Sequence, residues 1–134
     1  MAASSAVIGY GATFTWDSSA IEEVTQFSTP SFKLDAVEAT FMASDNTYRE
    51  YIPGLCEGGE ITLSCNYRPK ATGQAKITSD LHGRTSASLV IVLPNSLGTW
   101  TQTCFVTGWN STVTTDGRMV GTATFKVTGK PVLS

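Results

Sequence analysis

Hydrophobic and polar residues alternate along much of the chain, which is the pattern expected of β-strands that bury one face. The clearest alternation lies at residues 60–67, where Ile61, Leu63 and Cys65 would share one face. Similar stretches occupy residues 12–16, 100–109 and 119–128. This period of two predicts a mainly β fold.

Two less regular strands are expected between the first two of these stretches. Residues 21–27 carry spaced apolar positions, and Pro30 then interrupts the pattern, since proline cannot donate to a sheet ladder. Between Phe32 and Phe41 the apolar residues first occupy even positions and then odd ones, and the switch falls between Ala36 and Val37. A β-bulge at that point would cause such a change.

The second half of the chain adds a central strand and a hairpin. Residues 87–93 are apolar on both faces, which predicts a strand covered on both sides and ended by Pro94-Asn95-Ser96. The next strand is expected to lead into a connection near Asn110. The Asp-Gly pair of Thr115-Asp116-Gly117-Arg118 is typical of a tight hairpin, here joining a strand around Val113 to the last long strand.

One segment breaks the alternation and predicts a short α-helix at about residues 73–82. Ile77 and Leu81 are four positions apart and would lie on one helical face. Thr72 would serve as the N-cap and Gly83 as the C-terminal stop. We expect this helix to cover an open side of the strands.

Residues 42–58 carry no strand signal and are interpreted as a long loop. Their apolar and aromatic content is unusual, because loops normally lie in water. Either the loop folds back on its own core, or it packs on a neighbouring copy. The residues concerned are Tyr48, Arg49, Tyr51, Ile52, Pro53 and Leu55.

The length of 134 residues suits one domain, which we assign to residues 1–134. Charged residues make up only 15 % of the chain, where about 25 % is usual. Thr and Ser together account for about a quarter of the residues. A surface poor in charge and rich in hydroxyl groups suits strands that other subunits cover.

The net charge of −2 argues against a protein that grips nucleic acid through its phosphates, since such a protein would be basic. Residues 1–60 hold nine acids and two bases, whereas residues 61–134 hold two acids and seven bases. Two interpretations stay open. In the first, the asymmetry is chance clustering along the sequence, and the two halves intermingle in the fold. In the second, the acidic part of one copy docks on the basic part of the next.

The sequence offers no constellation for catalysis, a cofactor or a metal. His82 is the only histidine, and it has no partner at a zinc-binding spacing. An odd number of cysteines, Cys56, Cys65 and Cys104, does not form a disulfide framework, and we expect Cys65 to be a small core residue. No signal peptide is recognised, so we expect folding in a reducing cytoplasm.

Three tryptophans, Trp16, Trp100 and Trp109, could form an aromatic platform for a sugar or for single-stranded nucleic acid. Trp16 shares a face with Phe14, and Trp109 would share a face with Phe105 because the two lie an even number of positions apart on one strand. Trp16 and Trp109 are therefore expected in the core. Trp100 is expected to be the exposed one. No basic stripe accompanies it, which disfavours a nucleic-acid surface.

Several segments together resemble the major tail tube proteins of lambda-like phages with long, non-contractile tails. The matching segments are Gly9-Tyr10-Gly11-Ala-Thr-Phe-Thr-Trp-Asp17, Tyr48-Arg-Glu-Tyr-Ile-Pro-Gly-Leu55, Gly58-Gly-Glu-Ile-Thr-Leu63 and Phe125-Lys-Val-Thr-Gly-Lys-Pro131. Their order and spacing span nearly the whole chain. The chain stops just after Pro131 and so resembles the bare tube domain, without the immunoglobulin-like domain that some relatives carry after it.

The resemblance implies a β-sandwich or barrel-like protomer with one short flanking helix. Six such protomers would close into a ring, and rings would stack into the virion tail tube through which viral DNA is delivered to the host cell. Implied partners are other copies of the chain, a tape measure protein, a tail-tip or baseplate initiator and a tail terminator. DNA would pass through the lumen without specific binding, no membrane is involved, and assembly would take place in the host bacterial cytoplasm.

Under this interpretation the apolar loop residues Tyr48, Arg49, Tyr51, Ile52, Pro53 and Leu55 would lie between subunits or rings. Channels of the family tend to be acidic, and Glu22, Glu38 and Glu60 are the candidates to line this one, with Asp35 less favoured. The alternatives are a monomeric β-sandwich that binds carbohydrate through Trp100, or an inner-tube protein of a contractile or type VI-like system. An enzyme that uses a cysteine or His82 is the remaining class.

Overall fold

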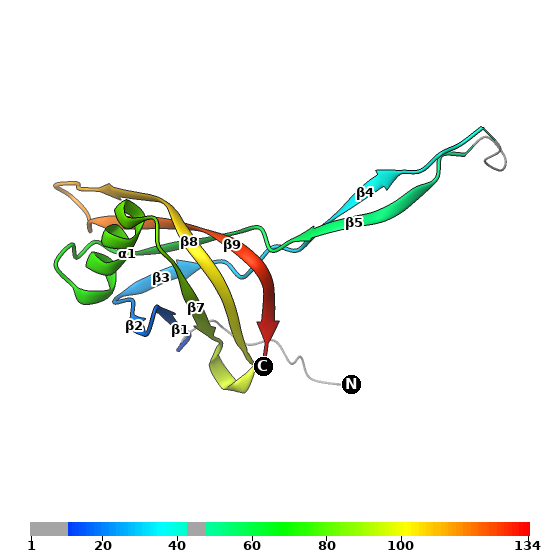
Figure 1. Ribbon diagram of the computed structural model, residues 1–134. Coiled ribbons are helices and arrows are strands. Elements are labelled where there is room, and N and C mark those ends of the chain that lie inside the picture. Colours follow the sequence, from blue (N-terminus) through cyan, green and yellow to red (C-terminus); the bar gives the residue numbers. More distant parts are fainter. Residues whose placement is uncertain (1–10, 43–47) are drawn as a thin grey trace, which may run out of the picture.

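The computed structural model describes residues 11–42 and 48–134 (Figure 1). It is mainly β, as the alternation predicts. The elements, in chain order, are β1 (Thr13–Trp16), β2 (Ser19–Ala20), β3 (Val24–Phe27), β4 (Lys33–Glu38), β5 (Tyr51–Glu57), β6 (Glu60–Asn66), α1 (Thr72–Gly83), β7 (Ser86–Val92), the 3-10 turn η2 (Pro94–Ser96), β8 (Thr99–Thr112) and β9 (Val120–Leu133).

Seven strands form one antiparallel sheet in the order β2-β1-β7-β8-β9-β6-β3. This sheet curls, because the rings of Phe14 on β1 and Phe27 on β3 touch across the core with centroids 5.6 Å apart, although five strand pairings separate the two strands. The curled sheet encloses the core, in which Trp16, Ile61 and Phe125 are fully buried. The body is therefore barrel-like, as expected.

Helix α1 covers the sheet beside β8, β1 and β2, and it confirms the helix expected at about residues 73–82 (Figure 1). Ile77 is fully buried and Leu81 packs against the core. The expected N-cap is wrong, because the Thr72 side chain caps nothing. Instead, the Glu22 carboxylate accepts a hydrogen bond of 2.9 Å from the Gly73 N–H.

The helix ends at Gly83 as expected, but the left-handed residue that follows is Arg84, with φ of 55° and ψ of 41°. The N-terminus of the helix lies so close to β2 that a Cβ at Gly73 would collide with the Ala20 carbonyl oxygen. Glycine is therefore required at that contact. No helix in the described residues is long and apolar enough to cross a membrane.

Several strand boundaries differ from the prediction. Strand β7 buries Leu89 and Ile91 on one face only, while Val92 on the other face is exposed, so it is not covered on both sides. Strand β8 runs past Asn110 to Thr112, because a bulge between Val106 and Gly108 restores its pairing with β9. The connection to β9 spans residues 113–119 and is longer than a tight two-residue hairpin.

The largest difference concerns residues 42–58, which are not one long loop. Residues 51–57 form β5, which pairs with β4 in a separate two-stranded sheet. The irregularity in β4 lies between Leu34 and Ala36, not between Ala36 and Val37. Residues 43–47 of the expected loop, like Gly9 and Tyr10 of the first matching segment, lie outside the described residues.

Candidate assembly surfaces

Strands β4 and β5 project from the body as a long hairpin (Figure 1). We call residues 33–42 and 48–57 the arm. Every residue of the arm except Gly54 is exposed, and Tyr48 and Leu55 keep 75 % and 81 % of their side-chain surface in contact with solvent. The other large hydrophobic side chains exposed along the arm are Leu34, Val37, Phe41, Met42, Tyr51 and Ile52.

Soluble monomers rarely expose many large apolar side chains together, and such surfaces are typical of interaction sites. An isolated two-stranded hairpin is also only marginally stable in water. Within the described residues, the body of the chain leaves the arm exposed. Of the two interpretations left open above, the folding of this segment back on its own core is wrong for the described residues.

The structure brings together the six residues expected between subunits on one strand of the arm and just before it. Tyr48 and Arg49 precede β5, and Tyr51, Ile52, Pro53 and Leu55 lie on it. Ile52 pairs with Val37 and Tyr51 with Glu38 across the hairpin, so both faces of the arm carry apolar groups. Their contact with a neighbouring copy stays a prediction.

The three candidate channel acids lie in different places. Glu38 ends β4 on the exposed arm, and Glu60 begins β6 on the outer face, opposite Lys126 of β9. Glu22 is half-buried against helix α1, where one of its carboxylate oxygens bonds Gly73 and the other is buried without a hydrogen-bond partner in the described residues. That these acids line a channel stays a prediction.

The ionisable groups of the body are used in packing. Burial raises the pKa of the Cys104 thiol to about 12, and burial together with the nearby Glu22 carboxylate raises that of Cys65 to about 11. His82 is exposed, and its Nδ1 lies 2.9 Å from the Thr78 carbonyl oxygen. Within residues 11–42 and 48–134, no group of three or more His, Cys, Asp and Glu side chains gathers as a metal site would require.

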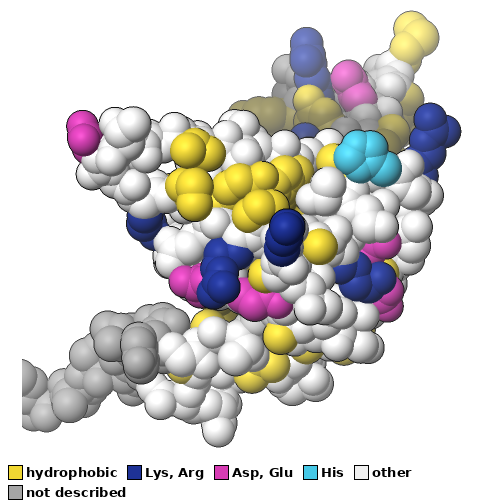
Figure 2. All heavy atoms as spheres, turned by 90° about the vertical axis from the view of Figure 1, so that its left-hand side faces the viewer, with side chains coloured by type: hydrophobic (Ala, Val, Ile, Leu, Met, Phe, Trp, Pro, Cys, Tyr) yellow, Lys and Arg dark blue, Asp and Glu magenta, His cyan; other side chains and the backbone are white. Residues whose placement is uncertain are grey.

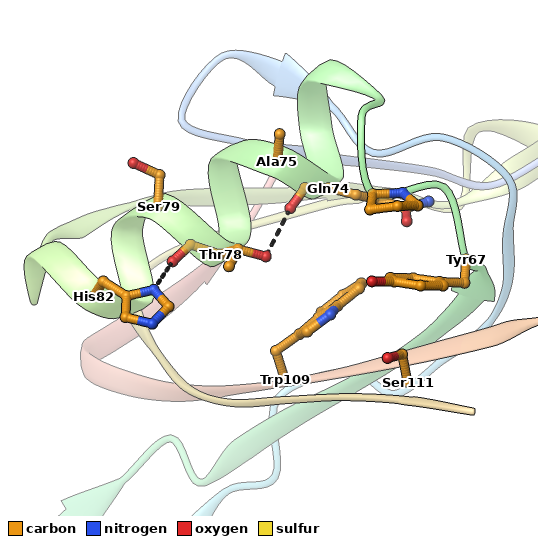
Figure 3. A pocket seen from close by; sticks show the side chains of 9 residues that line it. Tyr67, Gln74, Ala75, Thr78, Ser79, His82, Trp109 and Ser111 are labelled. Carbon is orange, nitrogen blue, oxygen red and sulfur yellow. Dashed lines mark hydrogen bonds between the residues drawn. The ribbon is translucent and has the colours of Figure 1, made fainter. Parts of the chain in front are cut away.

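A pocket of about 390 Å³ opens at the end of the body away from the arm, between α1 and the far end of β8 (Figure 3). The Tyr67 and Trp109 rings lie 6.2 Å apart and form one wall. A Cβ at Gly121 would lie 2.9 Å from the Trp109 ring, so glycine lets this ring lie across β9. The remaining lining residues are Pro69, Gln74, Ala75, Thr78, Ser79, His82 and Ser111.

The alternation along the sequence does not predict this pocket, and the face expected for Phe105 and the exposure expected for Trp100 are wrong. The bulge after Val106 changes the parity of β8, so that Trp109 faces the core side together with Ala123, while Phe105 faces outward. Trp109 is half-buried and packs against the core, as expected, and its ring also lines the pocket. Trp100, expected to be the exposed one, is half-buried against Phe32 with ring centroids 5.5 Å apart. Trp16 is fully buried, as expected.

Hydrophobic side chains gather into a patch at this same end of the body (Figure 2). The exposed Val113 and Met119 of the β8–β9 connection add to the pocket residues. Basic residues flank the patch. Arg68 pairs with Glu23 at 2.9 Å, and this hydrogen bond holds the pKa of the Glu23 carboxyl below its usual range. Arg118 bonds the Asn66 side chain.

Comparison with known proteins identifies a family. A model of the lambda phage tail tube protein family matches residues 11–134. No curated protein sequence matches the chain.

Solved structures share the fold at low sequence identity. A chain in the virion of a native gene transfer agent particle has a TM-score of 0.79 and 14 % identity, over 96 % of this chain and 99 % of that one. A chain of the sheath/tube terminator of the PVC extracellular contractile injection system has a TM-score of 0.78 and 17 % identity, over 99 % of both chains. The SPP1 tail tube protein has a TM-score of 0.74 and 10 % identity, over 96 % of this chain and 78 % of that one.

Proposed function

The chain belongs to the lambda phage tail tube protein family, whose members are structural components of virion tails, and we propose that it self-assembles into hexameric rings that stack into such a tube. Viral DNA would pass through the lumen to the host cell. The role is structural and not enzymatic. The solved tail of an empty gene transfer agent particle, refined with C6 symmetry, contains a chain of the same fold with a TM-score of 0.71.

The observation that carries this proposal is the exposed arm. Burying an apolar side chain such as Leu or Ile is worth about 1.5–3 kcal/mol relative to leaving it in water. The arm leaves Tyr48, Tyr51, Ile52 and Leu55 exposed on one strand or just before it, and the body of the same chain does not cover them. A neighbouring copy supplies that cover in a repeating assembly.

The contacts between copies would use Tyr48, Arg49, Tyr51, Ile52, Pro53 and Leu55. Arg49 can pair with an acid of the neighbour, while the apolar side chains fill its surface. Ring closure would also cover the exposed edges of the sheet at β2 and β3, which would otherwise invite uncontrolled pairing with other chains.

The lumen would be lined by a polar face with little net charge. The outer face of β6 carries Glu60, Thr62 and Ser64, with Lys126 of β9 opposite Glu60, and such a wall would offer DNA no strong binding site. Glu38 would contribute from the arm. Glu22 is the weakest of the three candidates, since its carboxylate already bonds the start of α1.

Further partners follow from the same assembly. A tape measure protein would occupy the growing tube, a tail-tip or baseplate complex would start it, and a terminator would end it. Terminator, cap and baseplate assemblies of contractile injection systems contain chains of the same fold, which supports the last two partners. The tube would be assembled in the cytoplasm of the host bacterium and released in the virion.

Negative-stain electron microscopy of the purified protein over a range of concentrations tests the proposal, with and without a tail-tip initiator. Hollow tubes or stacked rings with a central channel are the expected result. A monodisperse small particle at every concentration, also with the initiator present, would overturn it. Quenching of tryptophan fluorescence by a sugar, without assembly, would then point to a carbohydrate-binding module.

A further inference from the structure

We propose that the Tyr67–Trp109 pocket, at the end of the body opposite to the arm, is the acceptor site for the arm of a second copy of this chain. The inference rests on the proposed function and deepens it. It names the surface of a second copy that covers the arm.

The pocket has the form of a docking site. Its Tyr67 and Trp109 wall is half-buried and held in place, because the Trp109 ring lies against Gly121 of β9. Gln74 at its base is buried, and its side chain bonds the Asn66 and Glu22 carbonyl oxygens and the Arg68 N–H. The walls are thus fixed before anything binds, which lowers the entropy cost of association.

The arm offers side chains that suit such a wall. Met42 and Tyr48 are the described apolar residues at its outer end, and Met42 is fully exposed. A flexible thioether and an aromatic ring both pack well against Tyr and Trp faces. The pocket volume of about 390 Å³ lies within the range of roughly 300–1,000 Å³ that is usual for ligand pockets.

Charge supports the same pairing. The described arm carries four acids and two bases, so its balance is negative. Lys70 follows the lining residue Pro69 in the sequence, and Arg118 bonds Asn66, which precedes Tyr67, whereas the neighbouring Arg68 is already paired with Glu23. Acidic and basic surfaces that meet in this way steer association and fix its orientation.

The positions of the two surfaces decide what kind of assembly results. The arm extends from one end of the body, whereas α1 and the β8–β9 connection, next to the pocket, lie at the other end (Figure 1). Because they lie at opposite ends, the arm cannot fill the pocket of its own chain. The arm and the pocket are also two different surfaces. Two different surfaces at opposite ends can link copies head to tail, and such heterologous contacts propagate into rings or filaments.

Site-directed disulfide crosslinking tests the inference. In a Cys56→Ser background, one sample of protein carries Met42→Cys and a second carries Ser111→Cys on the pocket rim. The two are mixed and oxidised. The matched control replaces Ser111→Cys with Thr101→Cys, an exposed position at the opposite end of the same strand β8. We expect at least about tenfold more mixed dimer with Ser111→Cys than with Thr101→Cys, because a docked arm raises the local thiol concentration.

A blocking variant gives a second readout. Ala75→Trp would fill the pocket from the exposed face of α1, and Ser86→Trp, outside the pocket, controls for a new surface tryptophan. We expect Ala75→Trp to keep the melting temperature of the protomer and to lose assembly. Ser86→Trp should assemble like the unmodified chain.

The outcomes separate this inference from the proposed function. Tubes without the Met42–Ser111 crosslink, or tubes from Ala75→Trp, would overturn the acceptor site and leave the tube function standing. The crosslink in a protein that forms no tube under any condition would support the acceptor site and overturn the tube function. The loss of both would overturn both.

Discussion

The indole Nε1 of Trp16 donates a hydrogen bond of 2.7 Å to Oδ2 of Asp80, and both residues are buried. The bond fastens β1 to helix α1 across 64 positions of the sequence. Lys76 adds its ammonium group 3.5 Å from the same carboxylate and 3.0 Å from Asp17 at the end of β1. This cluster anchors the helix over the core.

We expect Asp80→Ala to destabilise the protomer by about 1–3 kcal/mol, because it leaves the buried Trp16 N–H without an acceptor. Asp80→Asn retains an acceptor oxygen and should cost less. Urea unfolding of the isolated protomer measures both. Asp116→Ala, at an exposed position in the β8–β9 connection, is the control and should stay within about 0.5 kcal/mol of the unmodified protein. Equal losses for Asp80→Ala and Asp116→Ala would contradict the prediction.

Glu22 is both the acceptor for the first turn of α1 and a candidate channel acid, and one variant separates these roles. Glu22→Ala should lower stability by about 0.5–2 kcal/mol, as the loss of a helix cap does. Glu60→Ala, at an exposed position, should leave stability nearly unchanged. Thermal unfolding followed by circular dichroism at the helix signal gives the comparison. An unchanged melting temperature for Glu22→Ala would show that the bond to Gly73 does not support the helix.

Removing apolar groups from the arm should affect assembly and spare the body. Tyr51→Ala combined with Ile52→Ala removes two exposed side chains, so the melting temperature of the body should change little. Tube formation, followed by light scattering and microscopy, should fall sharply. Val132→Ala, also exposed but on β9, is the control. A sharp drop in melting temperature together with normal assembly would mean that the arm packs within its own chain.

The three thiols should differ in reactivity. At about pH 8 only the exposed Cys56 should react rapidly with a thiol reagent, because the thiolate is the nucleophile and the buried Cys65 and Cys104 stay protonated. All three should react after unfolding in denaturant. Rapid modification of two or more thiols in the folded protein would show that the core opens more readily than its burial indicates.

The same thiols make stability fall at high pH. An unfolded thiol ionises near the ordinary value of 9.0, whereas Cys65 and Cys104 hold their protons to about pH 11 and about pH 12 in the folded state. Their contribution to stability is complete below pH 9 and is lost as the pH rises through the folded-state values. Unfolding titrations of Cys104→Ala and the unmodified chain between pH 8 and 10 should therefore differ in slope.

Assembly should depend on salt. The arm is acidic and basic residues flank the pocket, and exposed charges more than about 8 Å apart are screened at physiological ionic strength. Added NaCl should therefore slow elongation, whereas the apolar part of the contact persists. Charge reversal of Lys70 to Glu should slow elongation at low salt and reduce its salt dependence. An elongation rate indifferent to salt would exclude an electrostatic contribution.

Elements whose burial follows a simple period can be predicted from the sequence alone. Ile61, Leu63 and Cys65 alternate because one face of β6 meets the core, and Ile77 and Leu81 recur at helical spacing because one face of α1 does. These patterns, with the conspicuous apolar content of residues 48–55, were enough to predict a mainly β protomer and a surface that needs a partner.

Features that lack a burial period become visible only in the folded chain. Hydrophobic and polar residues do not alternate along β5, because neither face of the arm is buried in the protomer. The pairing of β5 with β4 therefore could not be predicted from the hydrophobic pattern. The bulge after Val106 turned Trp109 toward the pocket, and a parity count cannot detect one inserted residue. The bonds from Glu22 to Gly73 and from Trp16 to Asp80 join residues far apart in sequence, which only the folded chain brings together.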